Sequence, residues 1–290
     1  QPSNVVAQGF NGAVSGHDIE SLDGGIGNEW GFVSEFNSWA NGTICTHGKI
    51  STQCSGVLVT KDGGKTYDNI DWHGTDGVDT DAMTGSFPTS KIWYIAGGLV
   101  QAESNPGPSF KSTIMKTMDG GETWSTVFNV SAPQNQPGKG VGGMEDVACT
   151  TPDICYAISA CYDDDCYNYK KRYGSFVHKT IDGGKTWKSI STNIPINNFL
   201  WTVVEDHINP KILFIGTEFG MYFSLDGGMS WTEFKEVPTI PIRDLEIHEG
   251  EDDLVAASFG RGFYIVDDYS PLREYSKSIE NKTAHLFSVK

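Results

Sequence analysis

Short runs in which apolar and polar residues alternate, or in which apolar residues stand together, recur along the chain and predict β-strands. One part of the chain fits four such strands, at residues 144–148, 154–159, 174–180 and 187–191. The next part fits four more, at residues 201–204, 211–216, 220–224 and 231–234. Almost no segment has the i, i+3, i+4 and i+7 apolar spacing of an amphipathic helix. The pattern therefore predicts an all-β protein made of four-stranded antiparallel sheets.

The same pattern continues on both sides of these two units. A final unit has three strands, at residues 241–247, 253–257 and 262–266, and two earlier units centre on residues 30–67 and 91–124. We therefore expect three parts: an N-terminal segment or remnant of a preceding unit at 1–29, about five repeated units at 30–272, and a C-terminal extension at 273–290.

A repeated octet is the strongest signal in the sequence. It begins with Ser or Thr, continues with Asp-Gly-Gly and closes with an aromatic residue, and its four copies occupy residues 60–67, 117–124, 180–187 and 224–231. A degenerate fifth copy begins at Ser21, with its aromatic residue displaced to Trp30. The four aspartates are 57, 63 and 44 residues apart, which is about the size of one four-stranded propeller blade. The repeat therefore predicts a β-propeller with about five blades visible.

The residue types of the octet suit the corner of a tight hairpin. Glycine tolerates the positive φ that such corners need, the aspartate can accept hydrogen bonds from turn amides, and the aromatic ring can fold back and bury itself. These structural roles fall to Asp62, Asp119, Asp182, Asp226, Tyr67, Trp124, Trp187 and Trp231. Aspartates that hold turns in this way are not available as catalytic residues.

The octet resembles the Asp box, or BNR repeat, of sialidases, sortilin-type receptors and some xyloglucan-cleaving glycosidases. This resemblance implies that each octet joins the third and fourth strands of a blade, at the rim away from the binding face. Residues 241–289 also resemble the end of secreted Asp-box proteins that are labelled glycosyl hydrolase or sortilin-like, through Pro241–Leu245, Gly260–Asp268, Ser270–Arg273 and His285–Phe287. The second resemblance implies a terminal last blade, and either further blades before Gln1 or closure by an unusual N-terminal segment.

Charge and cysteines indicate the compartment and exclude some partners. The net charge of −16 would repel nucleic acid and anionic membrane surfaces, and no apolar run is long enough to span a membrane. Six cysteines lie close together in sequence as Cys45 and Cys54, Cys149 and Cys155, and Cys161 and Cys166, which favours three local disulfides. Glycosylation sequons start at Asn41, Asn129 and Asn281. We therefore expect a secreted, extracellular or luminal glycoprotein.

No catalytic constellation can be recognised. A sialidase needs an arginine triad from separate blades, but three of the four arginines (Arg172, Arg243, Arg261 and Arg273) fall at the end of the chain. A glycosidase needs two suitably spaced carboxylates. The candidates on predicted inner strands are Glu145, Asp146, Glu205, Asp206, Asp244 and Glu246, which we interpret as solvated acids. We expect Arg261 to pair with Asp267 or Asp268 as a structural clasp in preference to binding a substrate.

Metal and sugar sites have equally weak support. Asp163, Asp164 and Asp165 stand together between two cysteines, and Asp76, Asp79 and Asp81 form a second acidic cluster. Ca²⁺ is the cation such oxygen donors would suit, but neither cluster has an ordered ligand spacing, so we expect no metal and no cofactor. Trp39, Trp72 and Trp93 could stack on sugars, although aromatic residues in blades are mostly core.

Two functional hypotheses remain. The first is a binding or assembly module for a protein or glycan ligand, with another segment or subunit completing the propeller. The second is part of a glycoside hydrolase that uses paired carboxylates in the propeller channel. Because no catalytic set is visible and loops on a rigid scaffold commonly bind ligands, the first is the prediction.

Overall fold

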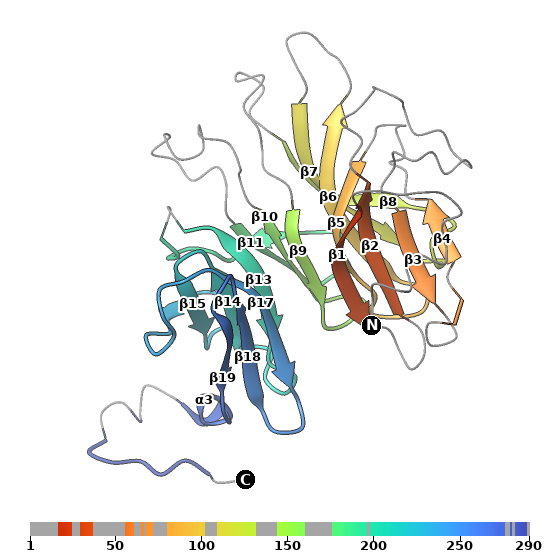
Figure 1. Ribbon diagram of the computed structural model, residues 1–290. Coiled ribbons are helices and arrows are strands. Elements are labelled where there is room, and N and C mark those ends of the chain that lie inside the picture. The colour runs from red at the N-terminus through yellow and green to blue at the C-terminus, as the bar shows by residue number, and fades with distance from the viewer. Residues whose placement is uncertain are drawn as a thin grey trace. The chain divides into compact units, whose positions relative to one another are not determined.

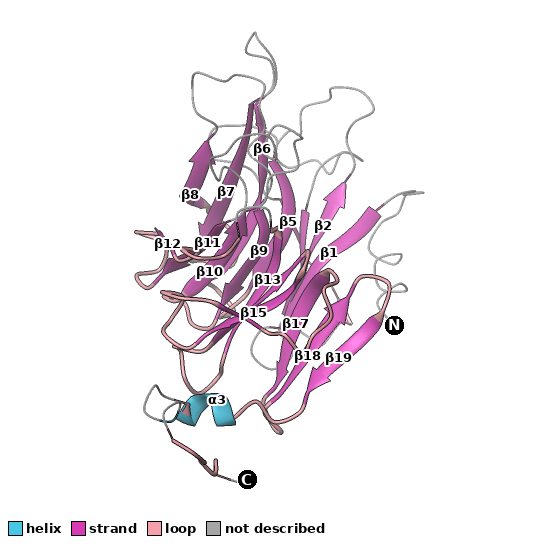
Figure 2. Cartoon of the chain, turned by 90° about the vertical axis from the view of Figure 1, so that its left-hand side faces the viewer, coloured by secondary structure: helices cyan, strands magenta, loops and turns pink. Residues whose placement is uncertain are grey.

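The computed structural model describes residues 17–24, 30–36, 56–60, 65–66, 68–71, 80–101, 109–131, 144–159, 176–195, 198–275, 279 and 282–288. Their secondary structure is almost entirely strand and connecting turn, as the predominance of strands in Figure 2 shows. The helix whose bounds are described is the short α3, Pro271–Glu274.

The strands form five antiparallel sheets, numbered here in chain order. Sheet 1 contains β1 (His17–Gly24), β2 (Trp30–Phe36), β3 (Gly56–Thr60) and β4 (Asp68–Asp71). Sheet 2 contains β5 (Thr80–Ser86), β6 (Trp93–Gln101), β7 (Ser109–Thr117) and β8 (Ser125–Ser131). In both sheets each strand pairs with the next one in the chain, so the connections are simple hairpins.

The remaining sheets repeat this order. Sheet 3 contains β9 (Met144–Cys149), β10 (Cys155–Ser159), β11 (Phe176–Thr180) and β12 (Lys188–Ser189). Sheet 4 contains β13 (Leu200–Glu205), β14 (Leu213–Thr217), β15 (Gly220–Ser224) and β16 (Thr232–Glu233). Sheet 5 contains β17 (Ile242–His248), β18 (Asp253–Ser258) and β19 (Gly262–Val266), with no fourth strand among the described residues. The predicted all-β fold of four-stranded antiparallel sheets is therefore confirmed, and the first sheet already begins at His17.

The chain divides into two compact units, and the division runs through sheet 3. The first unit comprises Gln1–Ser175 and Lys179–Lys188, and the second comprises Phe176–His178 and Ser189–Lys290. Within the second unit, β17 lies beside β13 and β14, as Figure 1 shows.

Each unit has its own apolar core between successive sheets. In the first unit, the buried Tyr94 and Ile114 of sheet 2 pack with Met144 and Val147 of sheet 3. Trp93 is 2% exposed, so its place in the core is confirmed. Burial of such side chains removes apolar surface from water and is the main stabilising contribution to this fold.

The core of the second unit lies between sheets 4 and 5. It includes Phe214 and Met221 from sheet 4 and Leu245 and Leu254 from sheet 5. The two sheets approach so closely at Gly216 that an added Cβ would lie 2.6 Å from the carbonyl oxygen of Ile242. Any larger residue at position 216 would push the sheets apart, which explains a glycine within β14.

The three described octets form the same hydrogen-bonded corner between the third and fourth strands of their sheets. In the corner at 224–231, Asp226 Oδ1 accepts hydrogen bonds from the Ser224 hydroxyl (2.8 Å) and the Ser230 amide (2.8 Å), and Oδ2 accepts one from the Ser230 hydroxyl (2.5 Å). The Gly228 amide donates to Ser224 Oγ at 2.8 Å. The octets at 117–124 and 180–187 repeat these contacts.

These contacts change the acidity of the octet carboxylates. Hydrogen bonds, first from Thr123 and then from Thr117, lower the pKa of Asp119 to about 2. Those from Thr186, together with a smaller one from Thr180, lower the pKa of Asp182 to about 2. Burial raises the pKa of Asp226, but hydrogen bonds from Ser230 and Ser224 outweigh it, so that its pKa is also lowered. All three aspartates are thus ionised acceptors at neutral pH.

The closing aromatic residues of the octets pack beyond their own corners. Trp231 is 4% exposed and donates its indole N–H to the Ile190 carbonyl oxygen at 2.7 Å. The Trp187 ring packs on Phe128 of sheet 2, with ring centroids 5.3 Å apart, and Trp124 lies 6.4 Å from Trp93. Rings that were expected to fold back under their own turns therefore also fasten neighbouring segments. The octet at 60–67, with Asp62 and Tyr67, lies outside the described residues apart from positions 60, 65 and 66.

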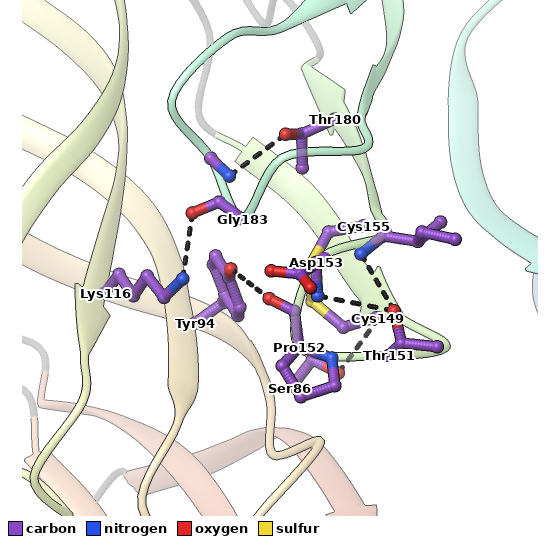
Figure 3. Close-up of a disulfide and its surroundings, with 12 residues drawn as sticks. Ser86, Tyr94, Lys116, Cys149, Thr151, Pro152, Asp153, Cys155, Thr180 and Gly183 are labelled. Carbon is purple, nitrogen blue, oxygen red and sulfur yellow. Dashed lines mark hydrogen bonds between the residues drawn. A yellow bond between two sulfur atoms is a disulfide. The ribbon is translucent and has the colours of Figure 1, made fainter.

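A disulfide joins Cys149 and Cys155 across the turn between β9 and β10, as predicted from their separation of six residues. Figure 3 shows how this turn is held. The Tyr94 hydroxyl donates to the Pro152 carbonyl oxygen at 2.7 Å, and the buried Lys116 ammonium donates to the Gly183 carbonyl oxygen at 2.9 Å. Burial lowers the pKa of Lys116 against a smaller opposite influence of Asp153. The disulfide thus belongs to the scaffold beside the octet corner at 180–187.

Candidate functional site

The strand order of the sheets gives each of them two different ends. Because the strands are antiparallel neighbours, the turn between strands one and two lies at the same end as the octet corner between strands three and four; we call this the box end. The turn between strands two and three lies at the opposite end. In sheets 1 to 3 this turn takes in residues 37–55, 102–108 and 160–175, whereas in sheets 4 and 5 it is only residues 218–219 and 259–261.

At this opposite end, sheets 4 and 5 carry a cluster of aromatic side chains around one arginine. The guanidinium carbon of Arg243, at the start of β17, lies 3.5 Å from the ring centroid of Trp201 and 5.5 Å from that of Phe259. The Phe199 ring is stacked with Trp201, with centroids 6.1 Å apart and planes inclined by 20°. Phe219 and Phe259 are 46% and 69% exposed. We call Phe199, Trp201, Phe219, Arg243 and Phe259 the aromatic–arginine surface.

Backbone hydrogen bonds hold the turns that carry this surface. The Glu218 amide donates to the Phe199 carbonyl oxygen at 2.9 Å, and the Phe259 amide donates to the Pro241 carbonyl oxygen at 2.9 Å. The Trp201 indole N–H donates to Glu218 Oε2 at 3.1 Å, which fixes the ring that Arg243 covers. The surface is therefore preorganised on short turns and strand ends.

Contacts with aromatic rings orient Arg243, which has no ionic partner among the described residues. Its side chain is exposed, and within the described part of the chain no carboxylate lies within salt-bridge distance of it. Arg261, two residues beyond Phe259, is exposed and is likewise without an ion pair among the described residues. The expected clasp to Asp267 or Asp268 is not formed; Asp268 instead accepts hydrogen bonds from the amide and hydroxyl of Ser270. A guanidinium held over an indole ring can present its N–H donors to an anion.

The inner-strand acid Asp206 has an entirely different environment at the box end. It is 2% exposed and accepts hydrogen bonds from Tyr269 Oη (2.6 Å), from Arg273 Nε (2.9 Å) and from the Asn209 amide (2.8 Å). The same guanidinium donates to both carboxylate oxygens of Asp252, at 2.7 and 2.8 Å. Burial raises the pKa of Asp206, but hydrogen bonds from Arg273 and Tyr269 outweigh it, so that its pKa is lowered. Asp206 therefore fastens the segment after β19 to sheets 4 and 5 and is not free for catalysis.

The other acids predicted to lie on inner strands are in the first strands of sheets 3, 4 and 5, in differing surroundings. Asp146 Oδ1 accepts a hydrogen bond of 3.4 Å from the Thr84 hydroxyl. Asp244 Oδ1 accepts one of 2.9 Å from the Leu245 amide, and burial against surrounding atoms raises its pKa although its side chain keeps exposed surface. Glu205 and Glu246 lie in β13 and β17. Glu145 lies in β9, and its side chain is outside the described set.

Several predicted site residues cannot be placed. Cys45, Cys54, Cys161, Cys166, Asn41, Asn281, Arg172, Trp39, Trp72, Asp76, Asp79 and Asp163–Asp165 lie outside the described residues. Asn129 and Asp81 lie in β8 and β5, without a described side chain. Among the side chains that are described, no group of three His, Cys, Asp or Glu residues could hold a metal ion. None of the described helices is long and apolar enough to cross a membrane.

Comparison with solved structures finds similar chains at low sequence identity. An ancestral GH74 enzyme matches with a TM-score of 0.53 and 13% identity, over 85% of this chain and 28% of the enzyme. The α-L-arabinanase of Penicillium chrysogenum complexed with arabinobiose matches with a TM-score of 0.51 and 14% identity, over 85% of this chain and 76% of the arabinanase. A protein of unknown function from Dyadobacter fermentans has the same score and identity, over 88% and 76%. The fold is a β-propeller.

At these identities the likeness to solved structures concerns the fold alone. No protein-family model and no curated protein matches the chain. The chain spans little more than a quarter of the GH74 enzyme, so that enzyme's activity is not transferable to the five sheets present here.

Sequence reasoning did not identify the aromatic–arginine surface, although the sequence carries a signal for it. The dipeptide Phe-Gly follows strand two in both sheet 4 and sheet 5, as Phe219-Gly220 and Phe259-Gly260. Both glycines have positive φ, of 105° and 80°, which turns the chain sharply and leaves the preceding phenylalanine at the tip. A recurring exposed aromatic residue at the end opposite the octets would have indicated this surface.

Proposed function

We propose that this propeller is a binding module that recognises a protein or glycan ligand, and that it does not catalyse a reaction. The observation that carries the proposal is Arg243, which is exposed, held against Trp201 at 3.5 Å and without an ionic partner among the described residues. Aromatic and arginine side chains are the types enriched where proteins bind partners most strongly.

The lengths of the connections between strands also favour the end opposite the octets as the binding end. In sheets 1 and 3 the connections between strands two and three, residues 37–55 and 160–175, are longer in sequence than the box-end connections of the same sheets. Long surface loops on a rigid scaffold are where binding residues concentrate. The proposal therefore assigns ligand binding to the end opposite the octets.

The test is binding of the full 290-residue chain, produced by secretion, to a glycan array and to a displayed peptide library, each in parallel with R243Q. We expect at least one ligand class whose capture is reduced in R243Q. If both screens give no ligand above a control protein, the binding proposal fails.

A glycoside hydrolase is the second candidate, and Asp244 is the observation that favours it. Burial raises the pKa of this inner-strand carboxyl, and a general acid in a glycosidase needs a raised pKa. Hydrolysis of arabinan or xyloglucan oligosaccharides that is lost in D244N would favour the enzyme over the binding module.

We also propose that another segment or subunit completes sheet 5. Phe263 and Ile265 of β19 are 74% and 58% exposed, and no fourth strand pairs with β19 among the described residues. Exposed strand edges are normally covered. Substitution of both residues by threonine should leave a monomeric chain folded but weaken association in sedimentation if a second subunit covers this edge; unchanged sedimentation would point to a segment of the same chain.

Secretion is part of the proposal and has its own test. The Cys149–Cys155 disulfide supports an oxidising compartment. We expect the intact mass of chain secreted from eukaryotic cells to fall on deglycosylation and to show three disulfides by alkylation before and after reduction. Free thiols together with an unmodified mass would contradict it.

A further inference from the structure

We infer that the aromatic–arginine surface recognises an acidic peptide segment of a partner protein, in which one carboxylate side chain is flanked by apolar side chains. This inference rests on the proposed binding function and names the ligand class. It combines three features of the surface: the Arg243 cation, the exposed phenylalanine rings beside it, and the nearby polar side chains that are hydrogen-bonded within the protein.

The cation selects the carboxylate. The guanidinium carbon of Arg243 lies 3.5 Å from the ring centroid of Trp201 and 5.5 Å from that of Phe259, so contacts with these two rings restrict the side chain. Its N–H groups are not used by any carboxylate of the described residues. A planar guanidinium of this kind pairs with a carboxylate through two parallel hydrogen bonds. An unrestrained arginine loses side-chain conformational entropy when it forms such a pair, whereas the Arg243 side chain is already restricted before the ligand binds.

The exposed phenylalanine rings of the surface favour a ligand in which apolar side chains stand next to that carboxylate. Phe219 and Phe259 come from equivalent turns of adjacent sheets, and both are exposed. Exposed phenylalanine rings offer apolar contact and no hydrogen bonds. A peptide that places its acidic side chain on Arg243 would therefore bury leucine-like or aromatic side chains against these rings.

The polar groups around the surface disfavour a sugar. Glu218 accepts the Trp201 indole N–H, and Asn198 Oδ1 accepts the Phe219 amide at 3.3 Å. Carbohydrate sites bind hydroxyl groups through several polar side chains as well as a stacking ring, and both of these polar side chains are engaged with the protein itself. One cation and two apolar rings match a peptide better.

The charge of the protein restricts the peptide further. With a net charge of −16, the chain repels a polyanion, and Arg243 is the cation that contacts the rings of the surface. A peptide with a single acidic residue among apolar ones can pair with Arg243 while the net negative charge of the protein repels it only weakly. We therefore expect one carboxylate, not an acidic run.

The experiment selects a phage-displayed library of random dodecapeptides on the full chain, with counter-selection on R243Q. Recovered sequences should contain one Asp or Glu flanked by Leu, Ile or Phe. For the best peptide, measured by fluorescence anisotropy, R243Q and the peptide's own Asp-to-Asn analogue should each weaken binding about tenfold or more, since a charged hydrogen bond is lost. R243K should be intermediate, because lysine keeps the charge without the planar fork.

R261Q is the matched control. It removes one exposed positive charge from the same end of sheet 5 but touches no described ring, so binding should change by no more than about threefold through general electrostatics. Thermal unfolding of each variant checks folding. The Asp-to-Asn peptide leaves the protein unaltered, so it decides the question even if R243Q does not fold.

Three outcomes overturn the inference: no enriched peptide, enriched peptides without an acidic residue, or equal binding to R243Q. If peptides fail but a glycan binds through Arg243, the peptide inference falls and the binding module stands. If neither peptides nor glycans bind, both fall.

Discussion

Two arginines of the second unit, Arg273 and Arg243, lie at opposite ends of sheets 4 and 5 and have opposite surroundings. Arg273 at the box end donates to two buried aspartates, Asp206 and Asp252, and lies near Tyr269. Arg243 stacks on Trp201 and meets no carboxylate among the described residues. The difference separates two uses of one side chain: a guanidinium whose donors pair with carboxylates stabilises the fold, whereas one that forms no ion pair with the described residues is available to a ligand.

The largest effect on stability should come from removing Arg273, the arginine that is paired with buried aspartates. R273M removes the guanidinium partner of the buried Asp206 and Asp252, leaving His207 as their basic neighbour, and the loss of a buried ion-pair partner costs about 3–5 kcal/mol of the free energy of unfolding. Urea denaturation followed by tryptophan fluorescence measures this loss. R261M removes an arginine that has no ion pair among the described residues, and should stay within about 0.5 kcal/mol of the unmodified protein. Equal midpoints for R273M and R261M would contradict a structural role for the network.

A second test compares two glycines of the same octet corner. Gly227 and Gly228 both have positive φ, of 75° and 89°. A Cβ at 227 would meet nothing within 4 Å, whereas one at 228 would lie 2.5 Å from Ile190 Cδ1. G227A should therefore cost about 1–2 kcal/mol for the backbone conformation alone, and G228A a further 1–3 kcal/mol, approximately, for overpacking. Thermal unfolding of the pair checks this; equal losses would mean that the corner moves away from Ile190 freely.

The box end is also the end that the sequence predicts well. Its corners depend on local chemistry, Ser or Thr with Asp-Gly-Gly, and local hydrogen bonds such as Ser224 with Asp226 follow directly from spacing. Strand alternation located the sheets because one face of each strand is buried. The Cys149–Cys155 disulfide closes a short turn and was equally local.

Long-range partners could not be predicted in the same way. Asp206 and Arg273 are 67 residues apart, and nothing in either local sequence indicates that they meet. The pairing of Arg243 with Trp201 depends on how β17 packs beside β13, which alternation does not specify. Arg261 was assigned a clasp from its proximity in sequence to Asp267 and Asp268, but Asp268 already accepts the hydroxyl and amide of Ser270.

A smaller effect is expected from the octet carboxylate at the box end. Burial raises the pKa of Asp226, and hydrogen bonds from Ser230 and Ser224 lower it more, to below the ordinary value of 3.8. The ionised side chain therefore stabilises the fold above pH 3.8, and this contribution is lost as the pH falls through the folded-state pKa. D226N should cost about 1–2 kcal/mol at pH 7, like the loss of a helix-capping side chain. A cost that stays constant in urea titrations from pH 7 down to pH 2 would contradict this origin.

The smallest effect, and one of opposite sign, should arise at Asp244. Burial raises the pKa of this carboxyl above 3.8, so the unfolded chain releases its proton at a lower pH than the folded chain does. Ionised Asp244 therefore lowers stability at neutral pH, and the penalty disappears as the pH falls below the folded-state pKa. Because the side chain keeps exposed surface, D244N should stabilise the protein at pH 7 by less than about 1 kcal/mol. Urea titrations of D244N and D226N at pH 7 measure the change in the free energy of unfolding for both variants, which should have opposite signs. A destabilised D244N would show that the carboxylate has a favourable partner. The contrast between paired charges at the box end and charges without an ion pair at the opposite end would then not extend to Asp244.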